Sequence, residues 1–305
     1  MKKYLALIRL PNLAIIVLLQ SMIYYGILLP VFRHNNIEPV LGRAYFVFFI
    51  LITLFVTASG YIINDIMDIE PDKINKPSKR IVGKSIEINH AKRIYFVFLI
   101  TGFVLSIWVA IAVSRLEYLI FYIIPVILLY FYSTKFKTSF LSGNLIVSFF
   151  SAGVTAIIFI FEFPGLVILR AVNPVSYTEL VSLFVALIVF SFLVSLLREI
   201  VKDIEDIEGD QYAGSGTLPV KAGVNTAKAV CGFISIVILI LLFYWIKSPV
   251  SSQNVKIYTI LALILPLTYA VWLLKNAETK KQFHKLSTVI KLIMLLGIMM
   301  VVFYF

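Results

Sequence analysis

Residues 178–210 read TELVSLFVALIVFSFLVSLLREIVKDIEDIEGD, an apolar run followed directly by an acidic one. Residues 178–197 are predominantly apolar and have the length of about 20 residues that a helix needs to cross a bilayer. Residues 198–210, which follow without a break, are rich in Asp and Glu. The stretch therefore predicts a transmembrane helix that runs directly into an acidic segment at one membrane face.

The composition of the whole chain agrees with a membrane protein. Of its 305 residues, 61% are hydrophobic and only 14% are charged, whereas charged residues make up about a quarter of a soluble domain. Long unbroken apolar runs exclude a membrane β-barrel, whose strands alternate apolar and polar residues. The single cysteine, Cys231, excludes an intrachain disulfide and a cysteine-based metal cluster.

Comparable apolar runs recur along the chain and predict an all-α polytopic membrane protein with nine transmembrane helices. We expect these helices, within one integral-membrane domain over 1–305, at 10–32, 44–64, 94–113, 117–132, 140–161, 178–197, 229–246, 257–274 and 286–305.

Lys and Arg are distributed unequally between the two sides of this nine-helix arrangement. Of 27 such residues, six lie on one side, and the other 21 lie on the side of the N-terminus. Those six are Arg33, Arg43, Arg115, Arg170, Lys247 and Lys256. Because cytoplasmic loops collect positive charge, the chain is predicted to reside in the cytoplasmic membrane with its N-terminus in the cytoplasm.

The acidic residues lie mainly in two windows. Of 16 Asp and Glu residues, four fall in 65–72 and six in 199–210. The windows follow the second and sixth predicted helices, four helices apart and on the same face of the membrane. This spacing predicts an internal repeat over about 1–139 and 140–285, followed by a final helix over about 286–305, with the windows facing each other across the repeat axis.

Within the first window, Asp65, Asp68 and Asp72 have the spacing i, i+3 and i+7. On a helix continuing from the second span, these three carboxylates share one face. Pro71 interrupts helical hydrogen bonding, so we expect Asp72 to lie on a bend.

In the second window, Glu199, Asp203, Asp206 and Asp210 also share one helix face, and Gly209 lies near an expected helix end. Several carboxylates at a membrane edge must take up protons or recruit a cation. Their hard oxygens suit Mg²⁺, which commonly completes its coordination with substrate phosphates and water. A phosphorylated substrate held through Mg²⁺ is therefore the chemistry that these windows favour.

Zinc is disfavoured because His34, His90 and His284 are scattered along the chain. Basic residues accompany the acidic windows and would supply donors to a diphosphate, although cytoplasmic loops collect Lys and Arg for topology as well. They are Lys73, Lys76, Lys79, Arg80 and Lys84 after the first window, and Lys135 and Lys137 on the intervening loop.

The two windows resemble the motifs N-D-x-x-D-x-x-x-D and D-x-x-x-D of the UbiA superfamily of intramembrane prenyltransferases. Asn64, Asp65, Asp68 and Asp72 match the first motif, and Asp206 and Asp210 match the second. Further segments resemble the family in the same order along the chain: Arg9-Leu10-Pro11-Asn12, Ile74-Asn75-Lys76-Pro77, Tyr132-Ser133, Lys135-Phe136-Lys137, Gly143-Asn144 and Gly214-Ser215-Gly216-Thr217-Leu218-Pro219.

This resemblance implies a nine-helix bundle around a central cavity, with two Mg²⁺ ions that neutralise the diphosphate of a polyprenyl donor. It implies catalytic roles for Asp65, Asp68, Asp206 and Asp210, and metal binding by Asn64, Asp68, Asp72, Asp203, Asp206 and Asp210. The residues expected to contact the diphosphate or the acceptor are Arg9, Asn12, Lys73, Lys79, Tyr132, Lys135, Lys137, Arg198 and Lys202.

Residues 198–210 look most like the branch of the family that transfers geranylgeranyl to geranylgeranylglyceryl phosphate. That resemblance favours a glyceryl phosphate lipid as acceptor, with an aromatic quinone precursor, hydroxybenzoate or dihydroxynaphthoate, as the alternative. Residues 79–84 read KRIVGK where this branch has R-P-I-P-S-G, which adds positive charge and removes two prolines.

Two other classes of protein compete with an enzyme. Intramembrane acids within repeats also occur in ion-coupled transporters, but transporter sites lie near the bilayer midplane, whereas these aspartates lie at helix ends. The other is a non-catalytic binder of prenyl lipids. For the enzyme we expect a polyprenyl diphosphate donor, a lipid or aromatic acceptor and membrane lipid as partners, and no nucleic acid.

Overall fold

The computed structural model describes residues 2–75, 80–248 and 252–303. Within these residues, nine helical segments are long and apolar enough to cross a membrane, as the sequence predicted. They are Leu10–His34 (α2, Leu10–Ser21, a π-helical turn, and α3, Leu29–His34), α4 (Gly42–Met67), α6 (Ile88–Ala112), Leu116–Phe136 (around α7, Ile120–Phe131), α8 (Ser142–Phe161), α10 (Pro174–Glu205), α13 (Val224–Lys247), Gln253–Asn276 (α14, Gln253–Tyr258, and α15, Leu265–Asn276) and Lys280–Phe303 (mainly α16, Lys280–Met299).

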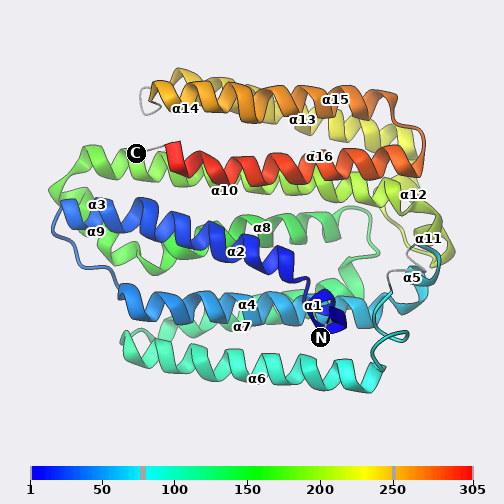
Figure 1. Ribbon diagram of the computed structural model, residues 1–305, viewed down its shortest axis with the longest axis horizontal. Helices are drawn as coiled ribbons and strands as arrows, with labels where there is room; N and C mark the ends of the chain where they lie inside the picture. The colour runs from blue at the N-terminus through cyan, green and yellow to red at the C-terminus, as the bar shows by residue number, and fades with distance from the viewer. Residues whose placement is uncertain (1, 76–79, 249–251, 304–305) are drawn as a thin grey trace.

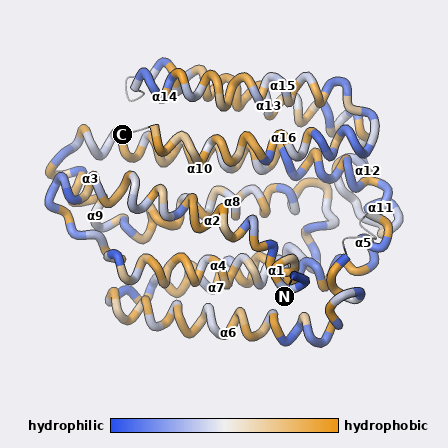
Figure 2. The backbone as a smooth tube through the Cα atoms, viewed as in Figure 1, coloured by the Kyte–Doolittle hydropathy of each residue, from blue (hydrophilic) through white to orange (hydrophobic). Residues whose placement is uncertain are grey.

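These helices lie roughly parallel to one another in a bundle (Figure 1). Apolar residues dominate the middle of each helix, and hydrophilic residues gather at the two ends of the bundle (Figure 2). The described residues form no β-strand longer than one isolated bridge, between Val82 and Ile86. The prediction of an all-α polytopic membrane protein is confirmed.

Five shorter helices complete the described chain: α1 (Lys2–Leu7), α5 (Ile69–Asn75), α9 (Phe163–Val172), α11 (Ile207–Tyr212) and α12 (Leu218–Ala222). In Figure 1, α5, α11 and α12 lie together at the end of the bundle opposite the C-terminus. We call this end of the bundle the site end.

Helix α10 is the central element of the bundle. It packs against α8, α13 and α16, and it buries Leu183, Phe184 and Val194 completely. By contrast, α6 and α13 expose large apolar side chains, including Ile100 on α6 and Phe243 on α13. Such exposed apolar surface suits contact with lipid rather than water.

Both acidic windows differ from the predicted continuous helices, because each helix breaks at an aspartate. Helix α4 ends at Met67, Asp68 has φ −86° and ψ 8°, and α5 begins at the next residue. The physical reason lies in Pro71, which has no N–H to donate to the Met67 carbonyl, so the break comes before the proline rather than at Asp72.

Asp206 occupies the same position in the second window, with φ −98° and ψ 9° between α10 and α11. Gly209 was expected near a helix end, and it lies buried within the short helix α11, which ends at Tyr212. The two matching breaks are what an internal repeat would produce, and the repeat boundaries stay a prediction.

Candidate active site

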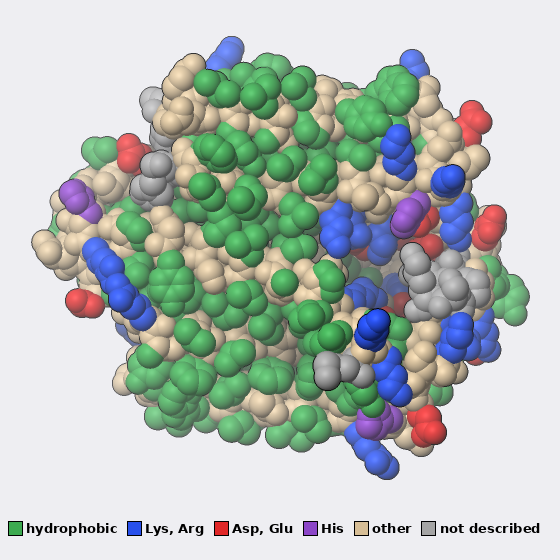
Figure 3. Space-filling model, viewed as in Figure 1, with side chains coloured by type: hydrophobic (Ala, Val, Ile, Leu, Met, Phe, Trp, Pro, Cys, Tyr) green, Lys and Arg blue, Asp and Glu red, His purple; other side chains and the backbone are tan. Residues whose placement is uncertain are grey.

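A cavity of about 1610 Å³ runs through the bundle between α2, α4, α7, α8, α10 and α16. Its polar part, at the site end, is lined by Asn64 and by the aspartates of both windows. These aspartates are Asp65, Asp68, Asp72, Asp203, Asp206 and Asp210. Figure 3 shows Lys and Arg side chains gathered around a hollow at this end of the molecule, with acidic side chains visible between them.

The remainder of the cavity is an apolar arm. Along α8 its lining extends from Gly143 to Phe161, which corresponds to about 27 Å at the rise of an α-helix. Tyr118 and Phe121 line the same far portion, and Tyr118 packs against Phe161 with ring centroids 4.1 Å apart. The cavity therefore joins a charged head region to a long apolar passage.

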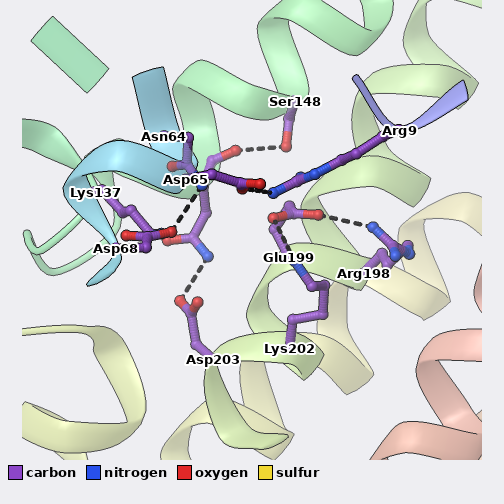
Figure 4. Close-up of polar contacts among 11 residues, drawn as sticks. Arg9, Asn64, Asp65, Asp68, Lys137, Ser148, Arg198, Glu199, Lys202 and Asp203 are labelled. Atoms are coloured by element: carbon purple, nitrogen blue, oxygen red, sulfur yellow. Dashed lines mark hydrogen bonds and ion pairs between the residues drawn. The ribbon is translucent and has the colours of Figure 1, made fainter. Parts of the chain in front are cut away.

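In the first window, the carboxylates have positively charged partners (Figure 4). Arg9 Nη2 donates to Asp65 Oδ1 at 2.8 Å. Asp68 accepts from Lys137 Nζ and, at 2.7 Å, from Asn64 Nδ2. Because Lys137 follows α7 and Arg9 precedes α2, this window is tied to two other parts of the chain.

The position of Arg9 depends on a break between α1 and α2. Arg9 has φ 51° and ψ 52°, the left-handed region that non-glycine residues rarely occupy, and Pro11 follows in the first turn of α2. Its guanidinium also lies 4.7 Å from the centroid of the Tyr61 ring. Unfavourable backbone geometry at a residue that also forms an ion pair in a cavity is typical of a functional position.

In the second window, Asp203 and Asp210 accept hydrogen bonds from neutral side chains. Asn144 Nδ2 donates to Asp203 Oδ2 at 2.7 Å, and Thr217 Oγ1 donates to Asp210 Oδ2 at 3.2 Å. Burial raises the pKa of the Asp210 carboxyl, the hydrogen bond from Thr217 opposes that rise, and the nearby charge of Asp206 adds to it. A raised carboxyl pKa indicates a site where a bound cation would be favourable.

The loops that carry these partners are joined to each other. Gly216 N–H donates to the Thr138 carbonyl at 2.7 Å, which links the segment after α11 to the segment that carries Lys137. A Cβ on Gly143 would lie 2.8 Å from the Phe136 carbonyl oxygen, so this position needs glycine for the close approach of two backbones. Asn144 follows directly, and the same contact therefore positions residues for both windows.

Beside the carboxylates lies a second group of charged residues on α10 and α16. Glu199 pairs with Arg198 at 3.0 Å and with Lys202 at 3.6 Å (Figure 4). Lys291 Nζ donates to Asn12 Oδ1 at 3.1 Å. All five of these residues line the cavity.

The oxygen donors of the acidic windows fit a hard divalent cation. In 2–75, 80–248 and 252–303, no three His, Cys, Asp or Glu side chains form a ready-made metal cluster. Mg²⁺ needs only one or two carboxylates when phosphate oxygens and water supply its other ligands. The buried Oδ1 of Asn64 has no hydrogen-bond partner, so this oxygen is available to a cation.

The structure brings most of the predicted substrate-contacting residues to the cavity. Those that line it are Arg9, Asn12, Tyr132, Lys137, Arg198 and Lys202. Lys73 is not in the lining and instead pairs with Glu70 at 2.6 Å on the surface. Lys135 is also outside the lining and lies over the Phe131 ring, and Lys79 falls outside the described residues.

The predicted site set lacks three residues that the structure adds to the cavity. Asn144 and Thr217 lie in segments with recognisable motifs, but their pairing with Asp203 and Asp210 depends on tertiary structure. Lys291 is the charged residue that interrupts the apolar run of the last span, and that interruption was the signal available in the sequence.

The fold and the site together define a helical integral-membrane protein with an acidic, internally accessible cavity. The model of the UbiA prenyltransferase family matches residues 21–298, so the chain belongs to the UbiA prenyltransferase family.

Relatives within this family share nearly the whole chain. The digeranylgeranylglyceryl phosphate synthase of Methanocaldococcus jannaschii is 33% identical over 96% of this chain and 93% of its own. The synthase of the same name from Methanosphaera stadtmanae is 32% identical over 89% of both chains.

Solved structures agree with this assignment. A structure of a digeranylgeranylglyceryl phosphate synthase has a TM-score of 0.63 and 29% identity, covering 99% of this chain and 98% of that chain. A UbiA homologue from Archaeoglobus fulgidus, solved with GPP and Mg²⁺, has a TM-score of 0.57 at 18% identity, covering 98% of this chain and 99% of that chain. The latter similarity establishes a shared fold.

Proposed function

We propose that this protein transfers a geranylgeranyl group from its diphosphate to the hydroxyl group of geranylgeranylglyceryl phosphate, in a reaction that requires Mg²⁺. The observation that carries this proposal is one continuous cavity in which facing carboxylates meet a long apolar arm. The two relatives described above are named as synthases of the corresponding product. The residue roles that follow belong to the same proposal.

The carboxylate end would hold the donor diphosphate. Asn64 and Asp68 on one side and Asp206 and Asp210 on the other would bind Mg²⁺, with Asp72 and Asp203 beside them and one ion at each window. Bound Mg²⁺ would neutralise the diphosphate and make it a better leaving group.

The other residues of the chain would bind and orient the two substrates. The Lys137 ammonium lies at the site end, next to Asp68, where it can donate hydrogen bonds to the leaving diphosphate. Tyr132 and Tyr61 line the same region and offer π faces to the allylic cation that forms as the C–O bond breaks. The apolar arm would hold the prenyl chain and exclude water, so that the acceptor hydroxyl rather than water forms the new C–O bond and loses its proton.

The site end is proposed to face the cytoplasm. The 21 of 27 Lys and Arg residues on the side of the N-terminus support this orientation. A single cysteine introduced at exposed Glu208, in a chain with Cys231 replaced by Ala, should react with a membrane-impermeant thiol reagent only from the cytoplasmic face.

The test of the proposal is transfer from radiolabelled geranylgeranyl diphosphate, with and without Mg²⁺. The acceptors are geranylgeranylglyceryl phosphate, a dihydroxynaphthoate and a hydroxybenzoate, each assayed separately. We expect Mg²⁺-dependent product with the glyceryl phosphate alone. Product with only an aromatic acid would overturn the acceptor while keeping prenyl transfer, and no product with any acceptor would overturn the activity.

A further inference from the structure

A layer of positive charge lies deeper in the bundle than the carboxylates. Arg198 precedes Asp206 by eight residues on α10, which places it about 12 Å further from the site end along the helix axis. Lys291 follows the start of α16 at Lys280 by 11 residues, or about 16 Å, and α16 packs along α10. Asn12, at the start of α2, contacts Lys291. We call Asn12, Arg198 and Lys291 the deep polar layer.

Lys291 is the residue of this layer that the rest of the site leaves unexplained. Its Nζ donates to the neutral amide of Asn12, and no carboxylate pairs with it among the described residues. It lies close enough to Arg198 for the two positive charges to repel each other. Placing a cation inside a membrane-spanning helix costs free energy. A cation there that has no acidic partner points to an anion that arrives with a substrate.

The charges around Arg198 reinforce this reading. Arg198 and Lys202 share the single carboxylate of Glu199, whereas the Arg9–Asp65 pair is neutral by itself. Arg198, Lys202 and Lys291 carry three positive charges, and the carboxylates near them are those of Glu199 and, beside Lys202, Asp203. Positive charge is therefore in excess. The Nε of Arg198 is also buried without a hydrogen-bond partner. A phosphate monoester carries about −1.5 to −2 at neutral pH and would supply the opposite charge.

We propose that the deep polar layer is a separate subsite for the phosphate of the acceptor. In this subsite, the Lys291 ammonium is the group that distinguishes a phosphorylated acceptor from an unphosphorylated one. This inference rests on the proposed function. It assigns the two phosphorylated substrates to different places: the donor diphosphate lies with the carboxylates, and the monoester lies on Lys291, Arg198 and Asn12. Separate subsites would keep the acceptor phosphate from competing with the donor diphosphate for Mg²⁺ at the carboxylates. They would also bring the acceptor hydroxyl toward the junction between the polar head region and the apolar arm, where the donor C–O bond breaks.

The experiment compares two acceptors that differ only in the phosphate: geranylgeranylglyceryl phosphate and geranylgeranylglycerol. Initial rates are measured with the purified full-length chain, its Lys291→Gln and Lys291→Arg variants and the Lys285→Gln control. Lys285 lies on the same helix but is exposed, and its Nζ lies 5.8 Å from the centroid of the Tyr269 ring. The KM for geranylgeranyl diphosphate is measured in parallel for every variant.

We expect Lys291→Gln to raise the KM for the phosphorylated acceptor about ten- to hundred-fold, the range for losing one hydrogen bond between charged groups. The KM for the donor and the rate with geranylgeranylglycerol should change less than about two-fold, because neither depends on contacts between Lys291 and the phosphate of the acceptor. Lys291→Arg should restore most of the preference for the phosphate, and Lys285→Gln should behave as the unchanged protein.

Several results would overturn the subsite. If Lys291→Gln lowers the rate equally with both acceptors, Lys291 has only a structural role through its contact with Asn12. If Lys291→Gln raises the KM for the donor, Lys291 contacts the diphosphate instead. If Lys291→Gln does not fold, Lys291→Met, which keeps the length and removes the charge, is compared with Lys291→Arg in the same way. An unchanged protein that does not use geranylgeranylglyceryl phosphate at all would instead overturn the proposed function, and the subsite with it.

Discussion

The two acidic windows share a backbone geometry but differ in the groups that donate hydrogen bonds to their aspartates. Asp68 and Asp206 interrupt their helices with nearly the same φ and ψ. Around the first break, Arg9 and Lys137 contact the carboxylates, whereas Asp203 and Asp210 in the second window accept hydrogen bonds from an amide and a hydroxyl group. Similar local sequence thus produces similar backbone, while the charge balance is set by distant segments.

This difference has a chemical consequence. Cations in direct contact offset part of the negative charge of Asp65 and Asp68, and the neutral hydrogen-bond donors to Asp203 and Asp210 do so less. The second window should therefore gain more from binding Mg²⁺, and the first should gain more from contacts between its cations and the diphosphate. The variants below test this division of roles.

The largest effect is expected from Asp206→Asn, which removes one of the carboxylates proposed to bind Mg²⁺ in the second window. Transfer should fall about 100- to 1000-fold, the range for loss of one group that stabilises developing charge. The Mg²⁺ concentration for half-maximal rate should rise more than it does for Asp68→Asn. Rates across a Mg²⁺ titration measure both quantities, and Glu208→Gln, an exposed acid two residues away, is the matched control. Full activity in Asp206→Asn and Asp68→Asn would contradict the metal assignment.

Lys137→Met should weaken the contact of the first window with the diphosphate and strengthen its binding of Mg²⁺. The variant loses an ammonium near the diphosphate, so kcat/KM should fall about 10- to 100-fold. Because Asp68 then keeps its full negative charge, half-maximal activity should require less Mg²⁺ than in the unchanged protein. Lys92→Met, an exposed change near the start of α6, should alter neither value. A Mg²⁺ requirement that rises instead would show that Lys137 does not neutralise Asp68.

Gly143→Ala should disturb both windows moderately, because the new Cβ would lie 2.8 Å from the Phe136 carbonyl and 3.0 Å from Lys137 Cα. The backbone must move, which should destabilise the fold by about 1–3 kcal/mol and shift Lys137 and Asn144 together. We expect kcat/KM to fall several-fold with a lower melting temperature. Gly232→Ala, where nothing lies within 4 Å of the added Cβ, should leave both unchanged or raise stability slightly.

The nine helices could be predicted because each requires only a local signal, a run of about 20 apolar residues. The residues of the two windows could likewise be recognised from their spacing. Breaks at Asp68 and Asp206 were harder to predict, since periodicity indicates which side chains share a face but not where hydrogen bonding along the helix stops. Pro71 provided a signal for the first break, but the second has no proline.

The partners of the acids could not be obtained from spacing at all. Asn144 lies 59 residues from Asp203, and Lys291 lies 279 residues from Asn12. The first contact arises from the packing of α8 against α10, and the second joins α16 to α2; no local pattern specifies either. The same limit explains Lys73 and Lys135: both have the charge expected of a diphosphate contact, but in the structure they are turned away from the cavity.

The smallest effect on catalysis is expected at the opposite end of the bundle. Glu162 is fully buried between α8 and α9, and its carboxylate accepts from the backbone N–H groups of Val40 at 2.8 Å and Leu41 at 3.0 Å. Glu162→Gln keeps one acceptor and places an NH₂ group against the other N–H, which should cost about 1–3 kcal/mol of stability. Thermal unfolding should therefore shift to lower temperature, while the Mg²⁺ requirement and KM values stay unchanged below that temperature. Exposed Glu179→Gln should change neither. A changed Mg²⁺ requirement in Glu162→Gln would mean that the two ends of the bundle are coupled through α8, and the contrast between the windows would then depend on more than their immediate partners.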